Sequence, residues 1–223
     1  MRSAIRSFVP LLLFACGTQT VPQKAVIDPR QWEPEIAAYE ASDRAKPPPS
    51  GGVVFTGSSS IRLWQTLQTD FRGVPVLNRG FGGSVLSDVL VFANRIVVPY
   101  KPRVVVLYAG DNDLAAGRTP AQVFADFKEF VAIVHRDLPN TRVAFIAIKP
   151  SILRENIIDK VRATNQLIRD YIATDPRLAY LDVFTPMLNS SGHPRRELFL
   201  EDGLHMNAKG YAIWRDRVAP VIR

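Results

Sequence analysis

Short apolar runs alternate with longer amphipathic stretches along most of the chain after residue 52. Five of these runs have the length of a β-strand, and the middle one, 104–107, is apolar at every position. A strand that is apolar on both faces is typical of a parallel sheet covered by helices on both sides. The predicted strands are 53–56, 74–78, 103–108, 142–148 and 178–183.

The stretches between these strands carry apolar residues at helical spacing. In the longest one these residues form a stripe that we interpret as core packing: Val123, Phe124, Phe127, Phe130, Val131 and Val134. The predicted helices are 61–68, 87–97, 119–138, 155–174 and 208–221, and an earlier one has Trp32, Ile36, Ala37 and Tyr39 on its apolar side. Five βα units in 223 residues predict a single doubly wound α/β domain, with a five-stranded parallel sheet and helices on both faces.

The first residues have the pattern of an export signal. Arg2 and Arg6 precede an apolar run, 8–15, which ends in small residues around Cys16. This run is far shorter than the roughly 20 residues needed to span a bilayer. We therefore predict a signal peptide at 1–15, a polar tether at 16–30 and the folded domain at 31–223.

Cys16 is the one cysteine of the chain, and so it cannot form an internal disulfide. The segment 13–16 resembles a bacterial lipoprotein signal, in which the cysteine is lipidated and becomes the new N-terminus. This resemblance implies an exported protein, lipid-anchored at the periplasm or outer membrane of a bacterium. The alternative is a plain secretory signal in which the cysteine has no role.

Composition and charge limit the classes of molecule that we expect the protein to bind. With 47% hydrophobic and 22% charged residues the chain is an ordinary globular protein. The net charge of +7 comes from scattered basic residues that form no stripe, so we expect no nucleic-acid partner. The spacing of Cys and His resembles no zinc site, and we expect neither a metal nor an organic cofactor. The sequence predicts no particular oligomeric state.

Polar segments follow the predicted strands, where a parallel sheet of this kind binds its ligands. The segment after the first strand leads from Gly57 through three serines into a helix, and the segment after the second holds three glycines, Gly80, Gly82 and Gly83. Each has a simpler interpretation when taken alone, because serine is a favoured helix cap and glycine is common in turns.

Two further segments carry donors, acids and a base. Asn112 follows the third strand within Gly-Asp-Asn-Asp, and its amide is a neutral donor suited to a developing oxyanion. Asp202 stands three residues before His205, so that a short turn can let the carboxylate orient the imidazole. His135 lies in a helical pattern and His193 in a loop, and we expect both to be structural or solvated.

The order and content of these four segments resemble the SGNH hydrolases, also called the GDSL esterase/lipase family, and most closely their branch related to platelet-activating-factor acetylhydrolase. The resemblance spans nearly all of residues 52 to 217. It implies Ser59, Asp202 and His205 as catalytic residues, and Ser59, Gly83 and Asn112 as oxyanion-hole donors. The first motif of the family usually reads Gly-Asp-Ser-Leu, whereas this chain has Ser58 and Ser60 on either side of Ser59. Those two serines are rivals for the nucleophile if the turn has another register.

The resemblance implies a serine esterase that works through an acyl-enzyme. We expect short acyl esters, such as acetyl groups on carbohydrate or envelope material, because the chain has no obvious long lid insertion. Lysophospholipase or thioesterase activity stays open, as does a non-catalytic envelope-binding protein on the same fold. Phe81, Tyr108 and Leu204 flank the motifs and either line an acyl pocket or pack in the core.

Overall fold

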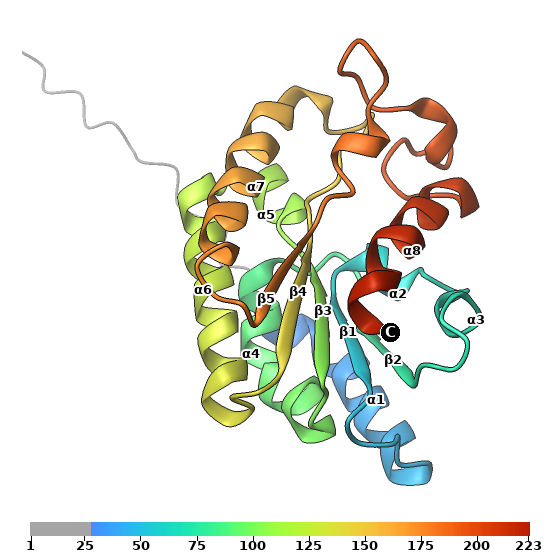
Figure 1. Ribbon diagram of the computed structural model, residues 1–223, viewed down its shortest axis with the longest axis vertical. Helices are drawn as coiled ribbons and strands as arrows, with labels where there is room; N and C mark the ends of the chain where they lie inside the picture. Colours follow the sequence, from blue (N-terminus) through green and yellow to red (C-terminus); the bar gives the residue numbers. More distant parts are fainter. Residues whose placement is uncertain (1–27) are drawn as a thin grey trace, which may run out of the picture.

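Five parallel strands form the centre of the molecule (Figure 1). The structure is a computed structural model and describes residues 28–223. The strands are β1 (Val53–Gly57), β2 (Val76–Gly80), β3 (Val104–Tyr108), β4 (Arg142–Ile146) and β5 (Leu178–Leu181). Their order is β2-β1-β3-β4-β5. Since the order reverses at β1, the carboxyl ends of β1 and β3 lie at the topological switch point, where doubly wound sheets bind ligands.

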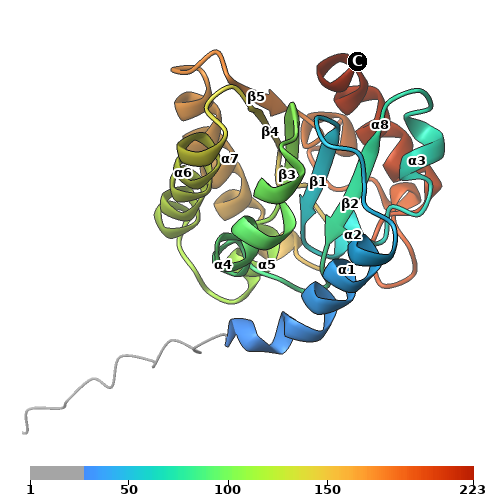
Figure 2. The same ribbon diagram turned by 90° about the horizontal axis from the view of Figure 1, so that it is seen from below.

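Helices cover both faces of this sheet, which confirms the predicted fold class (Figures 1 and 2). One layer holds α1, α4, α6 and α7, and the other holds α3 and α8. The α-helices are α1 (Glu33–Ala45), α2 (Ser59–Arg62), α3 (Leu67–Asp70), α4 (Leu86–Ile96), α5 (Asp111–Ala115), α6 (Pro120–Asp137), α7 (Ile158–Ile172) and α8 (Ala208–Ile222). The 3₁₀-helices are η1 (Pro29–Trp32), η2 (Val98–Tyr100), η3 (Glu155–Ile157), η4 (Thr185–Met187) and η5 (Arg196–Leu198).

Aromatic side chains fill the layer between the sheet and α8. Trp64 packs edge-on against Phe55 and Trp214, and Tyr108 lies 4.7 Å from Trp214 between ring centroids. On the other side of the sheet the predicted stripe of α6 is buried except for Phe124, which is only partly buried. Phe81 and Tyr108 are fully buried, so both pack in the core rather than line an open pocket.

Most predicted elements differ from the observed bounds by one or two residues, and the predicted helix 155–174 comprises η3 and α7. Two differences have a specific physical cause. The single helix expected at 61–68 is two short helices, α2 and α3, because the Trp64 side chain turns into the core between them and its indole donates to Asp70 at 2.7 Å. The second strand begins at Val76 instead of Val74 because Pro75 has no N–H for the ladder; its carbonyl accepts from Val53.

The N-terminal predictions fall largely outside the described residues. The predicted signal peptide, Cys16 and most of the tether precede residue 28. The tether's last two residues, 29 and 30, belong to η1. In α1, Ile36 is buried as predicted, whereas Ala37 faces solvent. Within 28–223, no helix is both long enough and apolar enough to cross a membrane.

Asp113 joins two of the loops at the carboxyl edge. Its fully buried carboxylate accepts from the backbone N–H of Leu86 at 3.1 Å, at the start of α4, and lies 2.9 Å from Arg118. Burial raises the pKa of Asp113 to about 6, although the Leu86 N–H and Arg118 both act to lower it. The folded protein therefore binds this proton more tightly than the unfolded chain does.

We predict that Gly57→Ala strongly destabilises the fold. Gly57 has φ +126°, and a Cβ there would lie 1.8 Å from the carbonyl oxygen of Tyr108. Backbone strain and the clash together are expected to lower the free energy of unfolding by roughly 3 kcal/mol or more, measured by urea denaturation. Gly73→Ala is the matched control, because Gly73 has φ +83° with nothing within 4 Å, and strain alone costs about 1–2 kcal/mol. Equal losses in the two variants would contradict this account.

We also predict a pH dependence of stability that comes from Asp113. The pKa is 3.8 for an ordinary aspartate and about 6 in the fold, so protonation favours folding within this window. As pH rises from about 4 to about 6, the wild type should lose stability relative to Asp113→Asn, by about 1 kcal/mol per pH unit at the steepest point. Parallel stability curves of the two proteins across this window, measured by urea denaturation, would refute the assignment.

Candidate active site

Ser59 begins α2 directly after the carboxyl end of β1. The chain can turn there because Gly57 lies against β3, and the N–H of Ser58 donates to the carbonyl of Tyr108 at 3.0 Å. Ser59 is partly exposed, while Ser58 and Ser60 are buried. Of the three serines, the structure thus presents Ser59 toward solvent at the helix N-terminus.

His205 meets Ser59 from the other end of the chain. Its Nε2 lies 3.1 Å from Ser59 Oγ, and its Nδ1 lies 2.6 Å from Asp202 Oδ2. The other carboxylate oxygen of Asp202 accepts the backbone N–H groups of Leu204 and His205, both at 2.9 Å. Because a carboxylate only accepts, Nδ1 carries the hydrogen and Nε2 is left to accept from the serine hydroxyl.

Asp202 is held in its ionised form. Partial burial alone would raise its pKa, but the hydrogen bonds from the backbone of Leu204 and from the side chain and backbone of His205 outweigh this effect and lower the pKa to about 2. Asp202 therefore stays an ionised acceptor for His205 Nδ1 at any pH well above 2.

Asn207 supports the turn that carries Asp202 and His205. Its side-chain oxygen caps α8 by accepting from Lys209 N at 2.9 Å, and its amide donates to the carbonyls of Glu197 and Phe199. Asn207 thereby joins the start of α8, which follows His205, to residues 197–199, which precede it.

Gly83 lies in the loop between β2 and α4, in a left-handed conformation with φ +73°. No residue within 28–223 accepts a hydrogen bond from its N–H. Trp32 packs over this loop, since a Cβ on Gly83 would lie 3.3 Å from the indole ring. The neighbouring Gly82 N–H donates to Glu35 at 3.2 Å, so the beginning of the folded domain helps to shape this loop.

Asn112 lies near the start of α5, after β3. Its Nδ2 donates to the carbonyl of Ser84 at 3.0 Å, so its amide lies beside the loop that contains Gly83. Its Oδ1 accepts from Arg154 at 2.9 Å. The structure thus brings the predicted asparagine and glycine together at the carboxyl edge of the sheet.

A cluster of three charged residues adjoins Asn112 and was not predicted from the sequence: Asp111, Lys149 and Arg154. Arg154 lies 3.1 Å from Asp111, and the buried Lys149 lies 3.5 Å from the same carboxylate oxygen. Burial lowers the pKa of Lys149, and Asp111 opposes this. Asp111 belongs to the Gly-Asp-Asn-Asp segment, but Lys149 and Arg154 follow β4 in a segment without any recognisable pattern.

The other two histidines lie elsewhere. His135 Nε2 lies 3.0 Å from the carbonyl of Thr141, and His193 is hydrogen-bonded to Glu155 at the surface. Neither contacts the Ser59 segment. No cluster of three or more potential metal ligands occurs in the described part of the chain.

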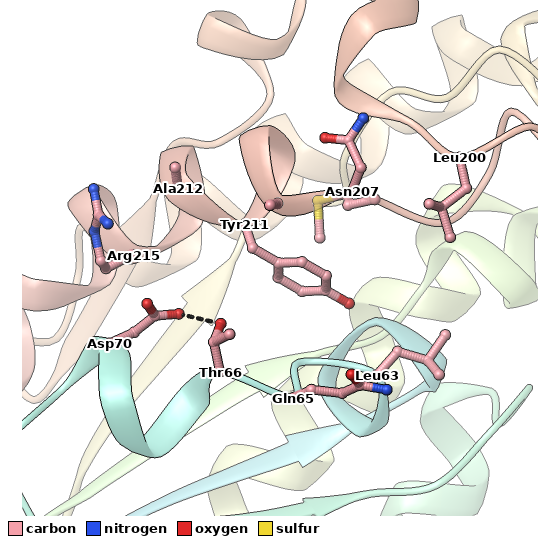
Figure 3. A pocket seen from close by; sticks show the side chains of 11 residues that line it. Leu63, Gln65, Thr66, Asp70, Leu200, Asn207, Tyr211, Ala212 and Arg215 are labelled. Atoms are coloured by element: carbon pink, nitrogen blue, oxygen red, sulfur yellow. Dashed lines mark hydrogen bonds between the residues drawn. The ribbon is translucent and has the colours of Figure 1, made fainter.

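A groove of about 450 Å³ lies beside the site, between α8 and the segment of α2 and α3 (Figure 3). Leu63 and Leu200 lie at one end, whereas Asp70, Thr66 and Arg215 lie at the other. Tyr211 lines this groove, and its hydroxyl donates to the carbonyl of Ser60 at 2.9 Å. The groove therefore adjoins α2, the helix that begins with Ser59. Ser59 and His205 do not line it themselves.

Comparisons with known proteins identify the family of the chain. Residues 50–213 match the GDSL-like Lipase/Acylhydrolase family. The alpha1 subunit of human platelet-activating factor acetylhydrolase IB is 28% identical over 204 residues, covering 87% of this chain and 84% of the human protein.

Solved structures share the fold. A GDSL-like lipase from Bacteroides thetaiotaomicron has a TM-score of 0.72 at 20% identity, over 84% of this chain and 96% of the lipase. A variant of an acetyl-xylooligosaccharide esterase from Geobacillus Stearmophilus has a TM-score of 0.62 at 13% identity, over 78% of this chain and 95% of the esterase. The family match covers most of the domain, and the chain is therefore a member of the GDSL-like lipase/acylhydrolase family of hydrolases.

Proposed function

We propose that this protein is a serine esterase that hydrolyses short-chain acyl esters through an acyl-enzyme on Ser59. The observation that carries the proposal is the continuous chain of hydrogen bonds from Asp202 through His205 to Ser59 Oγ. A serine hydroxyl is a weak nucleophile at neutral pH, and this arrangement supplies the base that activates it.

The reaction follows from the positions of these atoms. His205 Nε2 takes the proton of Ser59 as Oγ bonds to the ester carbonyl carbon. The tetrahedral intermediate collapses, the carbon–oxygen bond to the alcohol breaks, and His205 returns the proton to the departing alcohol. Water then attacks the acyl-enzyme in the same way, which releases the acid and regenerates Ser59.

The negative charge that develops on the carbonyl oxygen needs donors that are already in place. In this proposal the donors are the backbone N–H groups of Ser59 and Gly83 and the side-chain amide of Asn112. The hydrogen bond from Asn112 to Ser84 supports this set, because it holds the amide beside the Gly83 loop. All three donors lie after β1, β2 or β3, at one edge of the sheet.

The substrate class is argued from the surroundings of the site. Phe81 and Tyr108 are packed in the core, so neither supplies the wall of a long acyl channel. The groove beside the site is lined by neither Ser59 nor His205, so it supplies no acyl channel to the nucleophile either. A relative of the same fold is named an acetyl-xylooligosaccharide esterase. We therefore favour acetyl and other short acyl esters of carbohydrate or envelope material.

The first experiment is hydrolysis of p-nitrophenyl esters from acetate to palmitate by the chain without residues 1–16. We predict turnover that falls with acyl length, and a loss of about 10⁴-fold or more in Ser59→Ala. Ser58→Ala is the matched control in the same turn; its buried hydroxyl has no hydrogen-bond partner within 28–223, so this variant should keep its activity.

Other outcomes select the remaining functions. A maximum at long acyl chains would favour a lysophospholipase or thioesterase over the proposed short-chain esterase. Absence of turnover in a folded protein would contradict the esterase and favour a binding protein. Activity that survives in Ser59→Ala but vanishes in Ser58→Ala would show that another serine is the nucleophile.

We further propose that the protein is exported and anchored by a lipid on Cys16. The support is the sequence alone: a charged start, an apolar run and the single cysteine at the end of that run. When the full chain is expressed in a bacterium, we expect it in the membrane fraction. We expect the Cys16→Ser variant to be lost from that fraction. Membrane association that is unchanged in Cys16→Ser would contradict the anchor.

A further inference from the structure

We propose that Arg154 is a positioning residue that orients the amide of Asn112 for oxyanion binding. This inference rests on the proposed function, and it adds a residue that the four motifs do not include. Arg154 lies in the segment between β4 and η3, far from Asn112 in sequence, and its guanidinium contacts Asn112 and Asp111 at the same time.

An asparagine side chain can present either its oxygen or its nitrogen to a given place, because the two ends have nearly the same shape. Only the nitrogen end can donate to an oxyanion. An amide turned the other way would place a partial negative charge against the developing charge. Catalysis by Asn112 therefore requires that something determine which way its amide faces.

The partners of Asn112 make this choice. Arg154 only donates, so the end of the amide that faces it must be Oδ1, at 2.9 Å from Nη2. The carbonyl of Ser84 only accepts, so the end that faces it must be Nδ2, at 3.0 Å. With the amide turned over, both hydrogen bonds would be replaced by repulsive contacts. One Nδ2 proton is used on Ser84, and the second is left for the oxyanion.

Asp111 in turn orients Arg154. Its carboxylate lies 3.1 Å from Arg154 Nη1, and both side chains are largely buried, at 8% and 20% exposed. The ion pair with Asp111 keeps the guanidinium beside α5, and the planar guanidinium loses less freedom than a lysine would when Nη2 binds Asn112. Lys149, 3.5 Å from the same Asp111 oxygen, adds a second cationic side chain to the cluster. The Arg154 guanidinium also polarises the Asn112 amide, because a hydrogen bond accepted at Oδ1 strengthens donation from Nδ2.

A purely structural role is the competing explanation, since Arg154 also counters the charge of Asp111. The two roles differ in one respect. If Arg154 acts through Asn112, its loss should matter only while Asn112 is present. If it merely stabilises the loop, its loss should have the same effect with and without Asn112.

The test is a double-mutant cycle on p-nitrophenyl acetate with Arg154→Met, Asn112→Ala and the combined variant. Asn112→Ala removes an oxyanion donor and should lower kcat by about 10²- to 10³-fold. Arg154→Met should lower kcat by roughly 10-fold or more with little change in KM, because the amide acts on the transition state rather than on bound substrate. In the Asn112→Ala background, Arg154→Met should have an effect of less than about 2-fold.

Arg177→Met is the control, because Arg177 pairs with Asp175 before β5, in contact with no residue of the site, and should leave kcat unchanged. If Arg154→Met does not fold, Arg154→Lys replaces it in the cycle, since lysine keeps the charge but cannot reach two partners with a planar fork. Unchanged kcat in the Arg154 variant would overturn the inference, and so would equal losses of kcat with and without Asn112. The proposed esterase would still stand in either case, provided that wild-type turnover depends on Ser59. Wild-type turnover that does not depend on Ser59 would overturn both.

Discussion

The close approach of β1 to β3 at Gly57 is the constraint on which the site depends. At that point a side chain of any size would overlap the Tyr108 carbonyl, and the next residue, Ser58, donates its N–H to that same carbonyl. The chain then turns sharply, so that Ser59 is the first residue of α2 instead of the last residue of the strand. The Ser59 hydroxyl consequently emerges at the switch point of the sheet, where it meets His205.

The second requirement is that loops from different strands are held to one another by buried polar contacts. Asp113 of α5 binds the first N–H of α4, Asn112 binds the carbonyl of Ser84, and Arg154 binds the α5 segment from the β4 side. Buried polar and charged groups of this kind cost free energy unless they are satisfied, so each of these contacts specifies one arrangement of the loops. The hydrogen bond between His205 and Ser59 connects the C-terminal segment to these loops in the same way.

The accuracy of the sequence predictions follows their physical basis. The strands and long helices were predicted well because each depends on a local apolar pattern, and the carboxyl-edge location of the four motifs follows from parallel strands alone. The helix expected at 61–68 was wrong because burial of Trp64 between the sheet and α8 overrides the local helical pattern. Arg154 was missed because nothing in its local sequence distinguishes it from a surface arginine.

The amino-acid sequence by itself determined the α/β class, the number of strands and the residue types that the chemistry needs, because these depend on local periodicity and on motif content. Only the tertiary structure decided that Ser59 and not Ser58 or Ser60 faces His205, which way the Asn112 amide points, and that Trp32 packs over Gly83. These features depend on contacts between segments far apart along the chain, and such contacts exist only once the sheet has brought those segments together.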